Sequence, residues 1–260
     1  MRRPSDPPAG LGGGGVPPYY QDEYVTIYHG DARDVIADLG PVSVDLLLTD
    51  PPYGMSYVSG RRANAANVSA DGVRQGMRIT RQVIAEAMPR LATDAHLLVF
   101  CHWQSWPDFY DALAPYADIK NALIWWKARG GMGDVAVEYA PDYEVILYAA
   151  RGRREIFGAG AHGARRKRVG AVLAGYPPVG SNRSHPTEKP VGLMRDLVER
   201  HTPADGVVLD PFMGTGATIV AARSIGRRAI GIEIEEAYCE IAAERLSQGV
   251  LDLAVAGGAQ

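Results

Sequence analysis

The sequence is poor in cysteine, and its potential metal-binding side chains are dispersed. Cys101 and Cys239 are its two cysteines, and they form no CxxC pair. The six histidines are scattered, with no HExxH motif and no cluster with cysteine, so we expect no metal site. A scaffold stapled by disulfides is excluded as well, which makes a reducing, cytoplasmic setting the expectation.

Long apolar runs are absent too. No stretch is long enough to span a bilayer, and no charged segment leads into an apolar one as in a secretory leader. Hydrophobic residues nevertheless make up 47% of the 260 residues, which supports a substantial core and excludes a disordered chain. We therefore expect a soluble protein that has no membrane partner.

The chain also lacks an overall excess of positive charge. Its formal net charge is −3, which taken alone argues against a polyanionic partner. The basic residues are concentrated, however, because residues 151–168 carry seven basic side chains against one acidic one, and five arginines lie between Arg61 and Arg81. Basic segments on an acidic body predict contact with a polyanion on one face, with solvated loops as the alternative interpretation.

Both ends of the chain are rich in small or helix-breaking residues. Residues 1–20 include four consecutive glycines and several prolines and are expected to form a flexible tail, and residues 251–260 look similarly loose. The remainder is expected to form two halves of one domain, residues 21–150 and 185–250. Residues 151–184, rich in Gly, Arg and Pro, are expected to be an insertion between them.

Between the tails, short apolar runs alternate with helical patterns. Strands are expected at residues 24–28, 44–49, 96–101, 122–126, 144–149, 207–210 and 228–234. Helices are expected at residues 33–39, 79–91, 106–113, 191–201, 216–225 and 235–248. Such alternation is typical of a doubly wound, mostly parallel α/β sheet covered on both faces, which binds its ligands at the carboxyl ends of the strands.

A glycine-rich loop follows the strand expected at residues 207–210. Gly214 and Gly216 permit a tight turn and the close approach of a ligand to the backbone. Glu233 ends the next expected strand, where its carboxylate would accept hydrogen bonds from both hydroxyls of a ribose. The loop lacks the third Gly or Ala of the dinucleotide fingerprint, and Asp210 suits an ammonium group better than a pyrophosphate. S-adenosylmethionine is therefore favoured as the cofactor, with NAD or FAD as the alternative.

The tetrapeptide Asp50-Pro51-Pro52-Tyr53 lies at the carboxyl end of the strand expected at residues 44–49. A proline-rich turn is the plain structural interpretation, but its place beside a buried strand, in a chain with a cofactor loop, favours catalysis. Asp50 and a proline carbonyl would accept hydrogen bonds from the amino group of a base and draw its nitrogen towards tetrahedral geometry. Tyr53 offers a flat face on which an extruded base can stack.

These motifs, in this order, resemble the amino-group DNA methyltransferases of bacterial restriction–modification and phage systems. The catalytic tetrapeptide precedes the target-recognition stretch and the cofactor loop, as in the permuted beta group of that family. The resemblance implies a Rossmann-like, S-adenosylmethionine-dependent methyltransferase fold with residues 151–184 as a small target-recognition insertion. It implies methylation of the N6 amino group of adenine in double-stranded DNA, with the target base flipped out of the helix.

The resemblance also assigns cofactor-binding roles. Asp31, in Tyr28-His-Gly-Asp, matches an element that contacts the cofactor adenine, and Ser184-His-Pro-Thr-Glu-Lys-Pro190 matches one that helps to hold the methionine end. The complete cofactor-binding set expected here is Asp31, Thr187, Lys189, Asp210, Phe212, Gly214, Gly216 and Glu233.

Three segments are predicted to contact DNA. Trp126 and Lys127 belong to Ile124-Trp-Trp-Lys, which resembles the family's strand near the target base. A loop at about residues 55–81 and the insertion are expected to leave the sheet near its carboxyl ends and to flank the catalytic pocket. Arginines of these two segments would hold phosphates, namely Arg61, Arg62, Arg165, Arg166 and Arg168.

Several alternatives stay open. Methylation of cytosine N4 uses the same chemistry, although those relatives more often carry Ser than Asp at the first catalytic position. RNA or protein methyltransferases tend to have Asn there and the reverse motif order. An NAD oxidoreductase or a non-catalytic DNA-binding module would leave Asp50 to Tyr53 unexplained. Homodimers are frequent in the family, but the sequence carries no interface signature.

Overall fold

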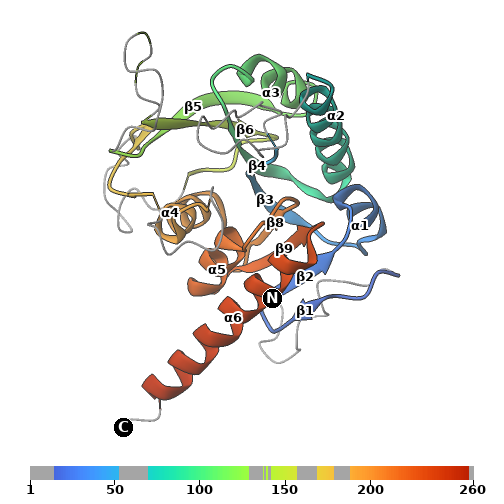
Figure 1. Ribbon diagram of the computed structural model, residues 1–260, viewed down its shortest axis with the longest axis vertical. Coiled ribbons are helices and arrows are strands. Elements are labelled where there is room, and N and C mark those ends of the chain that lie inside the picture. The colour runs from blue at the N-terminus through green and yellow to red at the C-terminus, as the bar shows by residue number, and fades with distance from the viewer. Residues whose placement is uncertain are drawn as a thin grey trace.

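Among the residues that the computed structural model describes (15–52, 70–128, 137, 139, 142–156, 169–178 and 188–257), nine strands form one sheet (Figure 1). Their order is β1-β2-β9-β8-β3-β4-β6-β5-β7. Pairing is parallel except between β1 and β2, β4 and β6, and β5 and β6. The predicted mostly parallel α/β sheet is thus confirmed.

The elements alternate along the chain as expected. The strands are β1 (Tyr20–Gln21), β2 (Val25–His29), β3 (Val44–Thr49), β4 (Leu91–Cys101), β5 (Asp118–Trp126), β6 (Tyr143–Ala150), β7 (Val172–Leu173), β8 (Val207–Asp210) and β9 (Arg228–Glu233). The helices are α1 (Ala32–Asp38), α2 (Ala70–Ala87), the 3-10 turn η1 (Met88–Arg90), α3 (Trp106–Leu113), α4 (Val191–His201), α5 (Ala217–Ser224) and α6 (Glu236–Gly257).

The central strands β3 and β4 each contain an apolar run, residues 46–48 and 97–101, whose side chains are buried on both faces of the sheet. Leu47 of β3 points into one core, which the sheet shares with α1, α2 and α3. Leu46 and Leu48 point into the other, which α4, α5 and α6 cover. Successive strand residues face opposite sides, so two cores require an uninterrupted apolar run. The sheet is therefore doubly wound, with described α-helices packed on each of its faces (Figure 1).

The direction of winding reverses between β3 and β8, which are neighbours in the sheet. Helix α2 follows β3 and packs into the first core through Val83 and Ile84. Helix α5 follows β8 and packs into the second core through Ile219 and Ala221. The two connections therefore leave the same edge of the sheet towards opposite faces, and ligands of doubly wound sheets bind at such a switch point.

Helix α2 begins earlier than expected. We predicted a DNA-contacting loop at about residues 55–81, but the described part of that range is helical from Ala70 onward. Arg74, Arg78 and Arg81 follow a spacing of three or four residues, which places them on one exposed helix face. Buried Met77 and Thr80 lie on the opposite face. A cluster of arginines is typical of a basic loop, but the spacing of these three arginines along the sequence is that of one face of a helix.

The expected tails are also shorter than predicted. Tyr19 donates a backbone hydrogen bond to Ile27 at 2.8 Å, and the Val16 amide donates to the Asp38 carboxylate at 2.7 Å. These bonds tie residues 16–20 to β2 and α1. At the other end, α6 continues to Gly257, beyond the expected end of the helix at residue 248.

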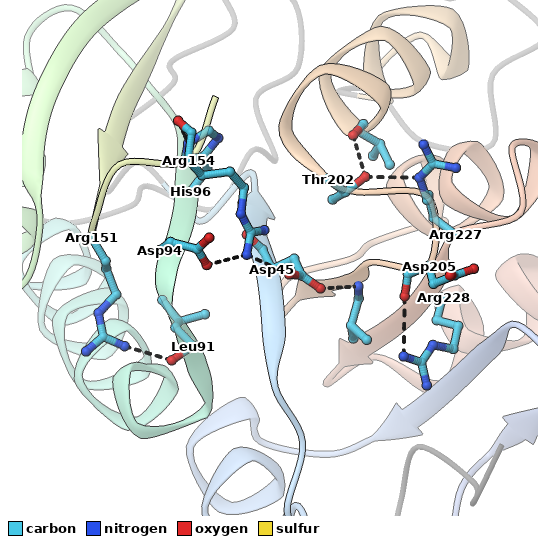
Figure 2. A network of polar contacts seen from close by, with 12 residues as sticks. Asp45, Leu91, Asp94, His96, Arg151, Arg154, Thr202, Asp205, Arg227 and Arg228 are labelled. Carbon is cyan, nitrogen blue, oxygen red and sulfur yellow. Dashed lines mark hydrogen bonds and ion pairs between the residues drawn. The ribbon is translucent and has the colours of Figure 1, made fainter. Parts of the chain in front are cut away.

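The start of the expected insertion lies at the opposite edge of the sheet from the one we predicted. Strand β6 runs antiparallel to β4, so the chain leaves β6 at the amino edge of the neighbouring strands. There Arg154 ion-pairs with Asp45, at 2.8 Å, and with Asp94 (Figure 2). Arg151 donates to the carbonyls of Leu91, at 2.8 Å, and Met88, at 3.0 Å. These two arginines join the ends of strands instead of reaching for phosphates.

A buried histidine pair extends this amino-edge network. The Nδ1 atoms of His96 on β4 and His201 on α4 lie 2.9 Å apart, and Tyr148 Oη lies 3.2 Å from His96 Nε2. Burial lowers the pKa of His96 from 6.5 to about 4 and that of His201 to about 3. Both rings are therefore neutral in the folded protein near pH 7, and their contact joins α4 to the sheet.

This pair should make the protein sensitive to acid. Unfolding exposes both histidines and lets them take up protons below their ordinary pKa of 6.5, whereas the folded pKa values are about 4 and 3. Stability should therefore fall as the pH drops below 6.5, by about 1.4 kcal/mol per pH unit for each histidine. Urea unfolding of His201→Asn at pH 7, 6 and 5 should show a shallower pH dependence than the wild type. Identical slopes would contradict this assignment.

Within the described residues, no helix combines the length and the apolar character needed to cross a membrane.

Candidate active site

Loops from both halves of the chain meet at the carboxyl edge of β2, β9, β8 and β3. His29 is paired in register with Glu233, and the Gly30 amide donates to the Glu233 carbonyl at 2.9 Å. Across the switch point, Thr49 donates its hydroxyl to Asp210 at 2.8 Å. The motifs that contain Asp31, Asp50 and Asp210 are therefore neighbours in space, although they are far apart in the sequence.

Two glycines with left-handed backbone conformations shape the loop after β8. Gly214 has φ +53° and Gly216 has φ +84°, conformations that side chains with a Cβ rarely adopt. A Cβ at Gly216 would lie 2.9 Å from the Cβ of Ala242, so this glycine also permits close packing against α6. A Cβ at Gly214 would meet nothing within 4 Å. The backbone at Gly214 therefore faces open space, where a ligand can approach it.

Asp210, the last residue of β8, is hydrogen-bonded to Thr49, the last residue of β3. It is buried, and it accepts hydrogen bonds from Thr49, from Thr218 Oγ1 at 2.5 Å and from the Phe212 amide at 3.2 Å. Burial raises its pKa from 3.8 to about 6, against the lowering effect of the three donors. The predicted contact of Asp210 with an ammonium group stays a prediction, because the described donors of its carboxylate all come from the protein.

Glu233 is the last residue of β9, and Asp31 follows the end of β2, the strand that pairs with β9. Glu233 accepts from the amides of Gly214 and Glu235, both at 2.9 Å, so its carboxylate is held against the glycine loop. Asp31 caps α1 by accepting from the Arg33 amide at 3.0 Å and also ion-pairs with the Arg33 side chain. The side-chain hydrogen bond from Arg33 is the main reason why the pKa of Asp31 lies below its usual value.

Lys189 lies against Asp50, the predicted catalytic carboxylate. We predicted from the family resemblance that it helps to hold the cofactor. In the structure its side chain is buried, its ammonium lies 5.0 Å from the centre of the Phe100 ring, and it ion-pairs with Asp50. A second ion pair, 3.1 Å long, joins it to Glu144 on β6. Burial lowers the pKa of Lys189, but Asp50 and Glu144 outweigh it and raise the pKa above its usual value.

Glu144 was missed by the sequence analysis. It also ion-pairs with Lys127, at 3.0 Å, so it lies between two lysines. Burial acts to raise its pKa, but Lys189 and Lys127 together bring it below the usual value. The sequence does hold a signal, because Glu144 shares a strand face with buried Ile146 and Tyr148. A carboxylate in such a position needs a partner.

Aromatic side chains are exposed at the same edge. Trp126 on β5 is 44% exposed, and its paired neighbour Tyr143 on β6 is 39% exposed. Trp103 and Trp106, which follow β4, are 56% and 40% exposed. Trp126 keeps a hydrogen bond from its ring nitrogen to Asp142 at 3.1 Å. The carboxyl ends of β4 and β5 and the amino end of β6 therefore present flat apolar surfaces to solvent.

Arg245 on α6 joins two parts of the predicted cofactor site, and the sequence analysis missed it as well. Its guanidinium ion-pairs with Glu188 at 2.8 Å and donates to the Thr215 carbonyl at 2.9 Å. Glu188 precedes Lys189, and Thr215 lies between the two glycines of the loop. Arg245 therefore clamps the segment before α4 against the glycine loop.

Some of the predicted site residues lie outside the described part of the chain. Of the tetrapeptide, Pro51 is buried and Pro52 exposed. Among the described residues, no group of three or more His, Cys, Asp or Glu side chains is arranged to hold a metal ion. The predicted residues beyond the described ranges are Tyr53, Arg61, Arg62, Arg165, Arg166, Arg168 and Thr187.

Comparison with known proteins identifies the family. The model of the N6/N4 DNA methylase family matches residues 44–244. The Type II methyltransferase M.HinfI of Haemophilus influenzae is 41% identical over 254 residues, covering 86% of this chain and 68% of M.HinfI. The DNA adenine methyltransferase YhdJ of Escherichia coli K12 is 25% identical over 258 residues, covering 88% of this chain and 85% of YhdJ.

A solved structure agrees with this result. The M1.HpyAVI complex with S-adenosylmethionine superposes with a TM-score of 0.68 at 27% identity, covering 85% of this chain and 98% of that one. The chain belongs to the N6/N4 DNA methylase family. It has the fold of the S-adenosylmethionine-dependent DNA methyltransferases.

The bond between Thr49 and Asp210 can be tested through stability. Thr49→Val removes a donor from a buried carboxylate and should destabilise the protein by about 1–3 kcal/mol at pH 7.5. The pKa of Asp210 is about 6, so at pH 5 the carboxyl is mostly protonated and the destabilisation should be smaller. Thermal unfolding at both pH values measures this difference. Thr26→Val, at a buried threonine of β2, is the control and should show no such pH dependence.

Proposed function

We propose that this protein transfers a methyl group from S-adenosylmethionine to the N6 amino group of adenine in DNA. The observation that carries this proposal is the position of Asp50. Its carboxylate follows β3 directly beside β8 and the open glycine loop, and Thr49 and Asp210 join the two strands at that point. A hydrogen-bond acceptor for the target amino group and a cradle for the cofactor thus share one edge.

The polar groups of the proposed cofactor site suit an adenosyl group. The Gly214 backbone is open to a ligand, and the carboxylate of Glu233 lies against it, where it can accept from ribose hydroxyls. Asp31 follows β2, the strand paired with Glu233, and is predicted to contact the adenine of the cofactor. When bound, S-adenosylmethionine supplies a methyl group already activated by the positive sulfur.

Asp50 would act on the target base and not on the cofactor. The lone pair of an exocyclic amino nitrogen is delocalised into the ring, so the nitrogen is a poor nucleophile. A carboxylate that accepts one N–H bond, together with a carbonyl of the proline pair, would favour the tetrahedral form in which the lone pair points at the methyl group. Charged acceptors that are already in position supply this kind of stabilisation without reorganisation.

The identity of the first residue of the tetrapeptide, Asp50, favours adenine as the target base. Asp at position 50 resembles the adenine-specific branch, whereas cytosine-N4 relatives more often have Ser there. The similarity to YhdJ, a DNA adenine methyltransferase, supports the same choice. The exposed Trp126, Tyr143, Trp103 and Trp106 supply surfaces on which unstacked bases can lie.

The first test of this proposal is Asp50→Ala. Methyl transfer to DNA should fall by about 100- to 1,000-fold or more, because the acceptor for the amino group is removed. Binding of S-adenosylmethionine, measured by calorimetry, should change little. Asp111→Ala, on the exposed surface of α3, is the matched control and should keep full activity. Near-normal turnover by Asp50→Ala would contradict the mechanism.

The same assay identifies the base. Digestion of the methylated DNA to nucleosides and mass spectrometry should give N6-methyladenine. N4-methylcytosine as the product would replace the adenine assignment by its alternative and leave the role of Asp50 unchanged.

The second test concerns phosphate binding. Replacing Arg165, Arg166 and Arg168 with Ala should lower DNA affinity and reduce the slope of log K against log salt by about 0.9 for each phosphate that is no longer neutralised. Arg153→Ala is the matched control, because Arg153 is exposed just beyond the end of β6, at the amino edge. The control should leave both quantities unchanged. An unchanged slope in the triple variant would mean that the protein holds DNA elsewhere.

A further inference from the structure

Four charged side chains form a continuous row at the carboxyl edge. Lys127 contacts Glu144 at 3.0 Å, Glu144 contacts Lys189 at 3.1 Å, and Lys189 contacts Asp50. The row alternates in sign and has no net charge. It starts at the end of β5, crosses β6 and ends after β3, so it connects the half of the sheet with exposed aromatics to the half with the glycine loop.

The centre of this row is shielded from water. The side chain of Lys189 is 6% exposed, while those of Glu144 and Asp50 are 21% and 22% exposed. An ammonium group so deeply buried is stable only if carboxylates compensate for its missing hydration. Among the described residues, Lys189 has two such partners, Asp50 and Glu144, and they come from different elements. Removal of either one takes away part of the compensation of a buried cation.

Glu144 is the better anchored of the two carboxylates. It belongs to β6, a strand paired on both sides with β4 and β5, and Lys127 holds its other oxygen. Asp50 instead follows the last residue of β3 and begins the connection to α2. Side chains on strands are held more accurately than side chains on loops. Glu144 therefore fixes the position of the Lys189 ammonium, which in turn fixes the position of the Asp50 carboxylate.

We propose that Glu144 is a positioning residue for methyl transfer, which holds Lys189 against Asp50 and so orients the carboxylate that accepts the target amino group. This inference rests on the proposed function. It assigns Lys189 to the catalytic carboxylate in place of the cofactor role expected from the family resemblance. Glu144 contacts Lys189 directly, and Lys189 in turn contacts Asp50, so the effect of Glu144 on Asp50 is exerted through Lys189.

The charges around Lys189 predict a pH signature. The titratable groups that face this region are Asp50, Glu144, Lys127, His102, Cys101 and Asp210. Burial lowers the pKa of Lys189 and the two carboxylates raise it. Without the charge of Glu144, burial remains and one compensating charge is gone. Lys189 should then lose its proton at a lower pH than in the wild type.

The experiment compares Glu144→Gln with the wild type and with Glu244→Gln, the same chemical change on the exposed face of α6. Glu144→Gln should lower kcat by about 100-fold, as expected for a misplaced reacting group. The KM for DNA and the Kd for S-adenosylmethionine should stay near their wild-type values, and activity should decline at a lower alkaline pH. Glu144→Asp, which keeps the charge, should recover part of kcat and the wild-type alkaline limb.

A second measurement is independent of activity. NMR titration of the ¹⁵N-labelled Lys189 ammonium should show a lower midpoint in Glu144→Gln than in the wild type. If kcat and the titration of Glu144→Gln both match the wild type, the inference is overturned. A purified wild-type protein that binds S-adenosylmethionine but methylates no DNA would instead overturn the proposed function, and the Lys189 titration would still decide whether Glu144 controls its charge.

Discussion

The contact between β3 and β8 is the constraint on which the site depends. These two strands belong to opposite halves of the chain, and the helices that follow them leave towards opposite faces of the sheet. Asp210 is buried between them and accepts hydrogen bonds from Thr49 on one side and Thr218 on the other. A buried carboxylate without its donors would be costly, so the same bonds that satisfy Asp210 keep Asp50 beside the glycine loop.

At each edge of the sheet, one basic side chain is held between two carboxylates. At the amino edge, Arg154 lies between Asp45 and Asp94 and joins the beginnings of β3 and β4 to the segment after β6. At the carboxyl edge, Lys189 lies between Asp50 and Glu144. Each is a cation held by two carboxylates from separate elements. In the first case the result is a fixed scaffold, and in the second the scaffold includes the residue proposed to act on the base.

The sheet also explains how one short chain accommodates both a cofactor and a large substrate. The cofactor loop belongs to β8 and β9, which lie inside the sheet between β2 and β3. The exposed aromatic residues belong to the ends of β4, β5 and β6, on the other side of Asp50. The proposed acceptor for the amino group therefore lies between the proposed cofactor site and the surface proposed to contact bases.

The sequence by itself determined the elements and the motifs. The apolar run at residues 44–49 becomes β3 with those limits, and α3, α4 and β8 also match their predicted limits, because hydrophobic periodicity is a local property. Asp50 and the Gly214 loop were recognisable for the same reason, since each motif is contained in a few consecutive residues. The neighbouring positions of the two motifs were expected only through the resemblance to a permuted family.

Tertiary structure alone decided which charged residues meet. Residues 151–154 lie at the amino edge because β6 pairs antiparallel with β4, and the direction of a strand is not encoded in its own apolar pattern. For the same reason neither the partner of Lys189 nor the role of Glu144 could be predicted. Glu144 lies 45 residues before Lys189 and 94 after Asp50 in the sequence. The three side chains meet because the segment before α4 lies against the face of the sheet that Glu144 of β6 shares with Ile146 and Tyr148, where a buried ammonium must have anionic partners.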